Sequence, residues 1–176
     1  PPYTIDETFF KRVDWAVEQA LQNDLQVVIN MHHYEEIFKE PAAHQERFLA
    51  LWEQIAAHYK DYPDSLVFEP LNEPNDKLTA RLWNDLLIEV LKRIRQTNPD
   101  RNVIIGPADW NSLYKLNELK LPEDDRQIIV TFHYYLPFQF THQGAEWVEG
   151  SAAWLGTTWT GTPAQHSALE RDLDQA

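Results

Sequence analysis

The sequence predicts an α/β fold in which parallel strands are covered by helices. Four short runs are almost continuously apolar, and they alternate with segments of helix length. Strands that are buried on both faces have continuous runs of this kind, whereas half-exposed strands alternate apolar and polar residues. The predicted strands are residues 27–31, 66–68, 103–105 and 128–132.

The first helix is predicted over residues 4–24. Thr4 and Glu7 form the S/T-x-x-E pattern of a capping box, in which two side chains satisfy free amides at a helix start. Apolar residues then recur at helical spacing until the pattern breaks before the first strand. The same periodicity predicts two more helices around residues 48–56 and 82–94.

The C-terminal part of the chain has a looser pattern. Residues 144–162 hold three tryptophans among Gly, Ser and Thr residues, which is typical of a long surface loop. Thr162 followed by Pro163 then suits the N-cap and first turn of a last helix.

Four strands with their helices form half of a (β/α)₈ barrel, which needs about 250 residues in its usual form. The competing architecture is a doubly wound sheet. It is disfavoured because no glycine-rich phosphate loop follows any strand, and all five glycines lie in the second half of the chain. We therefore expect residues 1–176 to form one partial barrel of the TIM type.

The composition narrows the classes of partner. Fifteen basic and 28 acidic residues give a net charge of −13, which repels nucleic acid and anionic membrane surfaces. No run of about 18 apolar residues occurs that could span a membrane, and we expect no signal segment at the N-terminus. The absence of cysteine excludes disulfides and thiolate metal sites. Seven tryptophans and seven tyrosines suit flat ligands such as sugars, although most aromatic rings in proteins lie in the core.

Polar residues follow each predicted strand, where the working residues of parallel α/β folds collect. After the second strand, Glu73 could transfer a proton while the neighbouring Asn72 hydrogen-bonds a substrate hydroxyl. The alternative is a plain turn in which Asn72 caps and Pro74 ends the strand. The other strand ends carry His32-His33, Asp109-Trp110-Asn111 and His133-Tyr134-Tyr135.

The histidines also raise the alternative of a metal site. His32 or His33 with Glu73 and His133 would give three ligands and an open position, as in catalytic zinc sites. However, no local spacing such as H-E-x-x-H preorganises such a site. Adjacent strand residues also point to opposite faces, so only one of His32 and His33 should face a ligand. We expect no metal and no cofactor, and the absence of G-x-S-x-G disfavours a serine nucleophile.

In their order along the chain, His32-His33, Leu71-Asn72-Glu73-Pro74 and His133-Tyr134-Tyr135 resemble the motifs of glycoside hydrolase family 5. Residues 132–148 are similar to the corresponding stretch of thermophilic bacterial endoglucanases of that family, some of which also cleave mannan. The similarity covers about residues 5–148. It implies a secreted (β/α)₈ enzyme, a retaining endo-β-1,4-glycanase, with β-1,4-glucan as the leading substrate and β-mannan as the second.

The resemblance also implies roles for individual residues. It assigns the catalytic acid/base to Glu73 and the hydroxyl-binding asparagine to Asn72. The histidine and tyrosine that follow the family's sixth strand correspond to His133 and Tyr135, and this tyrosine partners the nucleophile in the family.

Four further residues are expected to bind substrate. The family's histidine on the third strand corresponds to His32 or His33, and Trp147 resembles the tryptophan that forms a platform for a sugar ring. Trp110 is assigned to the site only by its position after the fifth strand.

Parts of the family pattern have no counterpart in these residues. These parts are the first, second and eighth strands and the nucleophilic glutamate, which in the family lies in a Gly-Glu-Phe-Gly-like turn after the seventh strand. We therefore expect the chain to span helix two to helix six of a barrel and to be inactive by itself. The alternatives are an assembly module whose open sheet edges pair with a second chain or copy, and a sugar-binding module that uses Trp110 and Trp147.

Overall fold

A computed structural model describes residues 3–176. Its centre is a parallel sheet with the strand order β1-β2-β3-β4, which confirms the predicted fold class. The strands are β1 (Val27–Asn30), β2 (Leu66–Glu69), β3 (Val103–Ile105) and β4 (Ile128–Val130). β1 therefore ends at Asn30 rather than at Met31, and β4 ends at Val130 rather than at Phe132.

The helices predicted around residues 48–56 and 82–94 are present, and shorter helical turns lie between the strands and in the C-terminal part. Within the described residues the α-helices are α1 (Glu7–Leu21), α2 (Glu35–Lys39), α3 (Pro41–His58), α4 (Ala80–Arg95), α5 (Ala108–Asn111), α6 (Phe138–Thr141) and α7 (Pro163–Leu173). The 3₁₀ turns are η1 (Leu113–Glu118) and η2 (Ser151–Trp154). None of these helices is long and apolar enough to cross a membrane.

The capping box predicted from Thr4 and Glu7 is wrong, because α1 begins only at Glu7. Asp6 is the N-cap, and its carboxylate accepts hydrogen bonds from the backbone N–H groups of Thr8 and Phe9. A carboxylate at this position satisfies the free amides and also interacts favourably with the positive end of the helix dipole. Asp6 therefore sets the start of the helix.

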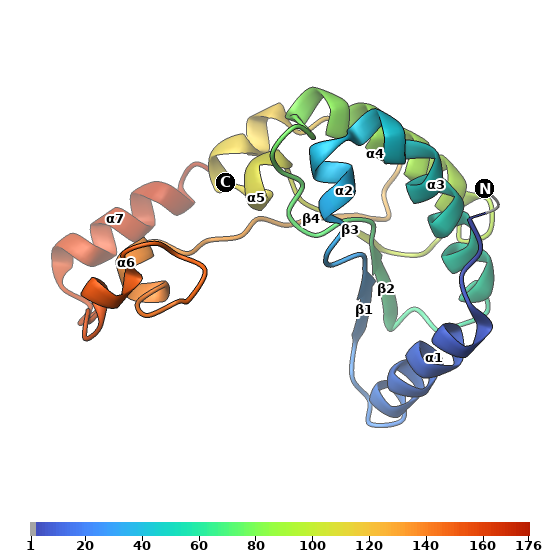
Figure 1. Ribbon diagram of the computed structural model, residues 1–176, viewed down its shortest axis with the longest axis horizontal. Coiled ribbons are helices and arrows are strands. Elements are labelled where there is room, and N and C mark those ends of the chain that lie inside the picture. The colour runs from blue at the N-terminus through green and yellow to red at the C-terminus, as the bar shows by residue number, and fades with distance from the viewer. Residues whose placement is uncertain (1–2) are drawn as a thin grey trace.

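Side chains of the strands alternate between the two faces of the sheet. One face packs against the helices, and α1, α3 and α4 form an arc along that side in Figure 1. This core includes Ile29, Phe68, Ile105, Trp52 and Trp83. On the other face, Val28 and Ile129 are 46% and 45% exposed. That apolar inner face is what the interior of a barrel requires.

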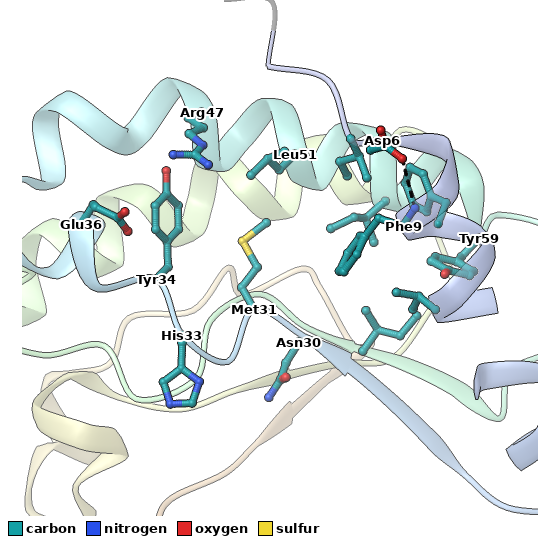
Figure 2. A pocket seen from close by; sticks show the side chains of 15 residues that line it. Asp6, Phe9, Asn30, Met31, His33, Tyr34, Glu36, Arg47, Leu51 and Tyr59 are labelled. Atoms are coloured by element: carbon teal, nitrogen blue, oxygen red, sulfur yellow. Dashed lines mark hydrogen bonds between the residues drawn. The ribbon is translucent and has the colours of Figure 1, made fainter. Parts of the chain in front are cut away.

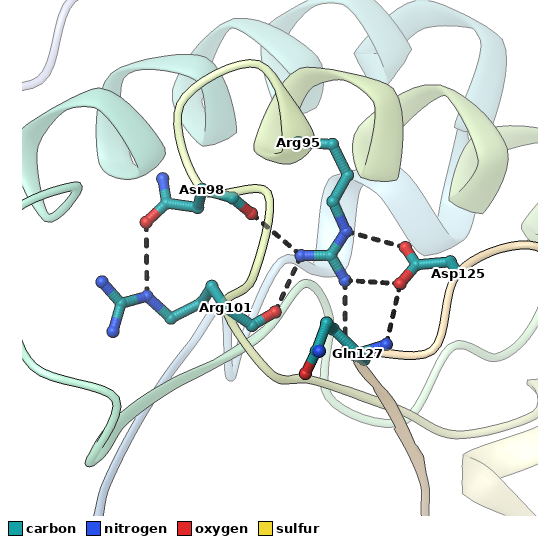
Figure 3. Close-up of polar contacts among 5 residues, drawn as sticks. All are labelled: Arg95, Asn98, Arg101, Asp125 and Gln127. Atoms are coloured by element: carbon teal, nitrogen blue, oxygen red, sulfur yellow. Dashed lines mark hydrogen bonds and ion pairs between the residues drawn. The ribbon is translucent and has the colours of Figure 1, made fainter.

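Two arginines link the loops at the amino ends of the strands. Arg95 pairs with both carboxylate oxygens of Asp125 at 2.7 and 3.0 Å, as Figure 3 shows. Arg101 is buried, and all five of its N–H groups donate to oxygen atoms. Its acceptors are the Asn98 side chain and the backbone carbonyls of Tyr59, Tyr62, Pro63 and Leu66. Arg101 thus holds the loop before β2 against the loop before β3.

We predict that Arg101→Met lowers the free energy of unfolding by about 3–5 kcal/mol, because it leaves several buried carbonyls without a donor. The matched control is Arg93→Met, which removes a half-exposed ion pair with Glu53 and is expected to cost less than about 1 kcal/mol. Urea denaturation of the two variants and the parent measures the difference. Equal stability losses would contradict a structural role specific to Arg101.

Beyond β4 the chain leaves the sheet and forms a lobe of α6, η2 and α7, which stands to one side in Figure 1. The predicted last helix is confirmed: the Thr162 hydroxyl accepts from the N–H of Gln165, whose side chain caps Thr162 in return. Tyr134, which lies between β4 and α6, contacts α7, because its hydroxyl donates to Asp172 at 2.9 Å. Burial and this hydrogen bond raise the pKa of Tyr134 to about 12.

Candidate active site

Glu73 lies in the turn that follows β2, at the carboxyl edge of the sheet. Its backbone is in the left-handed region, with a φ of 48°. Such a conformation costs a non-glycine residue roughly 1–3 kcal/mol and is concentrated at functional sites. The side chain of Asn75 donates to the Glu73 carbonyl at 2.8 Å and holds the turn. The strand itself ends at Glu69, so Pro74 does not end it.

The Glu73 carboxyl group meets the imidazole of His133, which follows β4. Oε1 of Glu73 and Nδ1 of His133 lie 2.5 Å apart. Both side chains are about one quarter exposed, at 27% for Glu73 and 26% for His133. Glu73 and His133 are therefore hydrogen-bonded to each other, although they are 60 positions apart in the sequence. Each of them was selected separately from the sequence.

Asn72 connects the ends of β1 and β2. Its backbone N–H donates to the carbonyl of Met31 at 3.1 Å, and the residue is 8% exposed. At the ends of the same two strands, the side chain of Asn30 donates to Glu69 at 2.8 Å. This pair was not predicted from the sequence, although a glutamate at the end of an apolar strand was a visible signal.

The turn after β3 has an unusual backbone. Asp109, Trp110 and Asn111 are all left-handed, with φ values of 61°, 58° and 56°. Aspartate and asparagine tolerate this region, but for a bulky residue such as tryptophan it is an outlier. The Trp110 N–H donates to the carbonyl of Pro74 at 3.2 Å, which ties this turn to the one that carries Glu73. The Trp110 side chain is 53% exposed at the same edge.

The prediction that His32 and His33 point to opposite faces of a strand is wrong, because β1 ends at Asn30. Both histidines lie in the following loop and both are exposed. Their rings contact each other edge to face, with centroids 4.7 Å apart. Nδ1 of His32 also lies 3.5 Å from the Asn30 amide. The alternation of side chains along a strand therefore does not determine which of the two histidines faces a ligand.

A cavity of about 510 Å³ lies beside this loop, between β1, α1 and α3. Figure 2 shows its lining, with His33 and Tyr34 at one end and the apolar side chains of α1 at the other. Glu73 and His133 do not line it. The cavity lies next to β1, which is an edge strand of the sheet, and it is separate from the Glu73–His133 pair.

The remaining predicted residues lie farther along the chain. Tyr135 is 51% exposed, and its ring centroid lies 6.3 Å from that of His133. Trp147 is 83% exposed and lies between α6 and η2 of the lobe. Residues 3–176 contain no cluster of three acidic or histidine side chains that could hold a metal ion.

Comparisons with known proteins point in one direction. Cel5A of Thermotoga maritima, whose crystal structures include complexes with mannotriose and cellobiose, is 52–53% identical, with a TM-score of 0.95 over 99% of this chain and 56% of that one. The cellulose synthase subunit Z of Clostridioides difficile is 45% identical, with a TM-score of 0.94 over 98% of this chain and 57% of that one. Endoglucanase H of Acetivibrio thermocellus is 44% identical over 81% of this chain and 16% of its own length.

The chain thus spans little more than half of the solved barrels and a smaller share of that endoglucanase. Its sheet agrees with a partial (β/α)₈ barrel. The model of one family matches residues 1–173, and its description is cellulase, glycosyl hydrolase family 5. The chain belongs to the cellulase family, glycosyl hydrolase family 5.

Proposed function

We propose that this chain forms the part of a retaining endo-β-1,4-glycanase barrel that extends from its second to its sixth helix, with Glu73 as the acid/base. The observation that carries the proposal is the Glu73–His133 pair at the carboxyl edge of the sheet. A hydrogen bond to Oε1 fixes the carboxyl group, while Oε2 stays available to a substrate. Catalytic residues of this barrel type lie at that edge.

In the proposed reaction, Glu73 protonates the glycosidic oxygen while the bond from this oxygen to the anomeric carbon breaks. A second carboxylate, supplied from outside these residues, bonds to the anomeric carbon. Glu73, now ionised, then removes a proton from the water that displaces this carboxylate. Asn72, next to Glu73, would bind a hydroxyl of the same sugar, and Tyr135 would contact the nucleophile.

The proposed substrate is a β-1,4-linked glucan, with β-mannan as the second candidate. Cel5A, which is similar to this chain, has been crystallised with cellobiose and with mannotriose. Glucose and mannose differ in the orientation of one ring hydroxyl, and a site that hydrogen-bonds this group can discriminate between them. His32, His33, Trp110 and Trp147 would supply contacts to the sugar rings. A polysaccharide too large to enter cells would also account for a secreted enzyme.

The free edges of β1 and β4 support a further part of the proposal. Neither edge has a strand partner within the described residues, and the inner face next to them is apolar. Unpaired edges of this kind pair readily with other strands. The remaining strands of the barrel, either on the same polypeptide or on a second chain, would satisfy them.

A chimeric barrel provides the test. In this chimera our chain replaces the matching segment of Thermotoga maritima Cel5A, so the remaining strands come from the relative. We expect the chimera to hydrolyse soluble β-1,4-glucan with retention of anomeric configuration, as followed by NMR of the first product. A folded chimera that leaves both glucan and mannan intact would contradict the proposal.

The proposed stacking of a sugar ring on Trp147 leads to a separate prediction. Trp147→Ala in an inactive chimera should weaken binding of cellotetraose by about 1–3 kcal/mol, the range known for bases stacked on aromatic rings. The matched control is Trp15→Ala, because Trp15 is also exposed, at 55%, but lies on α1. Titration calorimetry measures both affinities. An unchanged affinity for Trp147→Ala would remove Trp147 from the binding site.

A further inference from the structure

We propose that Asn111 is a positioning residue that keeps His133 a hydrogen-bond donor to Glu73, so that the catalytic proton is carried on Oε2 of Glu73. This inference rests on the proposed function, because it specifies how the acid/base is oriented. No role was expected for Asn111 beyond its place after a strand. Asn111 is buried, makes two contacts with His133 and has a closely packed side chain.

Asn111 holds both the backbone and the ring of His133. Its carbonyl accepts from the N–H of His133 at 2.8 Å, and its side-chain Nδ2 lies 3.3 Å from Nε2 of the imidazole. The residue is completely buried, at 0% exposure. Its Oδ1 is the buried side-chain atom that lacks a hydrogen-bond partner among residues 3–176. The amide therefore makes its side-chain hydrogen bond to the histidine alone.

The surroundings of Asn111 leave its amide little room. A Cβ atom on Gly106 would lie only 2.4 Å from the Asn111 side chain, so the glycine is needed for this close approach. The Gly106 carbonyl is itself held by the indole N–H of Trp83 at 2.9 Å. The left-handed backbone of the preceding turn exposes Asp109 and Trp110 while Asn111 is directed inward. Strained backbone and close packing together place one amide against one imidazole.

This contact determines which nitrogen of His133 carries the proton. The NH₂ group of an asparagine can only donate, so Nε2 of His133 must accept and carry no proton. A neutral imidazole then has its proton on Nδ1, which faces Oε1 of Glu73 at 2.5 Å. Oε1 accepts this hydrogen bond. The proton that Glu73 gives to the leaving group is then on Oε2, directed away from the histidine.

The opposite tautomer would misdirect the acid. With its proton on Nε2, His133 would present an unprotonated Nδ1 to Glu73. The carboxylic acid would then donate its proton to the ring instead of to the glycosidic oxygen. An amide of Asn111 turned by 180° would favour this arrangement, because Oδ1 would accept from Nε2. The orientation of one buried amide therefore distinguishes a productive from an unproductive acid.

Nitrogen-15 NMR of histidine-labelled chain reads the tautomer directly, without any catalytic assay. His133 is assigned by the signals that disappear in His133→Phe. We expect the parent to show a protonated Nδ1 and an unprotonated Nε2. Asn111→Leu, which removes the donor, and Asn111→Asp, which has nearly the same shape but supplies an acceptor, should both shift the proton toward Nε2. If Asn111→Leu does not fold, Asn111→Asp gives the same test.

Asn84→Leu is the matched control, because Asn84 is also buried and hydrogen-bonded but contacts Glu118 and Lys120 instead of His133. It should leave the His133 signals unchanged. In the chimeric barrel, Asn111→Leu should lower kcat on unactivated oligosaccharides by about 10- to 10²-fold, as when a partner that fixes a histidine tautomer is lost. KM should stay nearly constant, and substrates with good leaving groups should be affected less.

A parent protein that already carries the proton on Nε2, or a tautomer that stays unchanged in both Asn111 variants, would overturn the inference. Failure of the proposed function has a different signature. In that case Glu73→Gln would leave activity intact, while the NMR experiment would still report on the contact between Asn111 and His133.

Discussion

Replacing Glu73 by glutamine in the chimeric barrel is expected to lower kcat on unactivated cello-oligosaccharides by about 10²- to 10⁴-fold, the usual contribution of a general acid. Glutamine keeps the shape of the side chain and can still accept a hydrogen bond from His133, but it has no proton to transfer. Substrates with very good leaving groups need little protonation, so their first step should be slowed much less.

Steady-state kinetics with a series of aryl glycosides of rising leaving-group pKa measures this difference. Glu146→Gln is the control, because Glu146 is an exposed glutamate of the lobe and should have no effect. Equal losses on activated and unactivated substrates would assign Glu73 another role. Unchanged activity on both would remove it from the active site.

The 176-residue chain by itself is expected to show no turnover of cellulose or soluble glucan. A retaining mechanism needs two carboxyl groups about 5–5.5 Å apart. By the family resemblance only Glu73 has a matching position in this chain. Asp109 lies in the turn after β3, and Glu146 and Glu149 are exposed in the lobe; the resemblance assigns the nucleophile to none of the three.

Supplying the remaining strands as a second polypeptide should restore activity if the two parts pair along the free edges of β1 and β4. The assay is release of reducing ends by each part and by the mixture, with mass spectrometry to show that no longer species is present. Turnover by the purified 176-residue chain alone would contradict the prediction.

The parallel sheet could be predicted because its signal is local. Residues 66–68 and 103–105 are short, apolar and flanked by helical periodicity, and both form strands as predicted. Glu73 could be selected because it follows such a strand beside Asn72. In each case the information lies within a few neighbouring residues, which is the range over which sequence patterns act.

The contacts of the site could not be predicted, because they depend on register and strand length. The error at His32 and His33 came from a strand that ends at Asn30. The pairing of Glu73 with His133 joins residues 60 positions apart, and no local pattern encodes it. Asn111 was visible only as a polar residue after a strand, because the left-handed turn that directs it inward has no glycine to reveal it.

The structural role of Arg101 could not be predicted from the sequence either. Arg101 has no acidic hydrogen-bond partner, and its acceptors are mostly backbone carbonyls, which every residue possesses. Only the assembled loops define its site. A charged residue before an apolar strand is usually solvated, so only its burial in the structure distinguishes a buried arginine such as Arg101 from an exposed one.

Azide rescue of Glu73→Ala in the chimeric barrel tests whether Glu73 is the acid/base of a retaining enzyme. An activated aryl glycoside still forms the glycosyl-enzyme without an acid, and azide then enters the space left by the carboxylate and attacks without needing a general base. We expect faster turnover with azide and a β-glycosyl azide product, because two displacements retain configuration. An α-glycosyl azide would identify Glu73 as the nucleophile, and an unchanged rate without any azide product would show that Glu73 is not the acid/base.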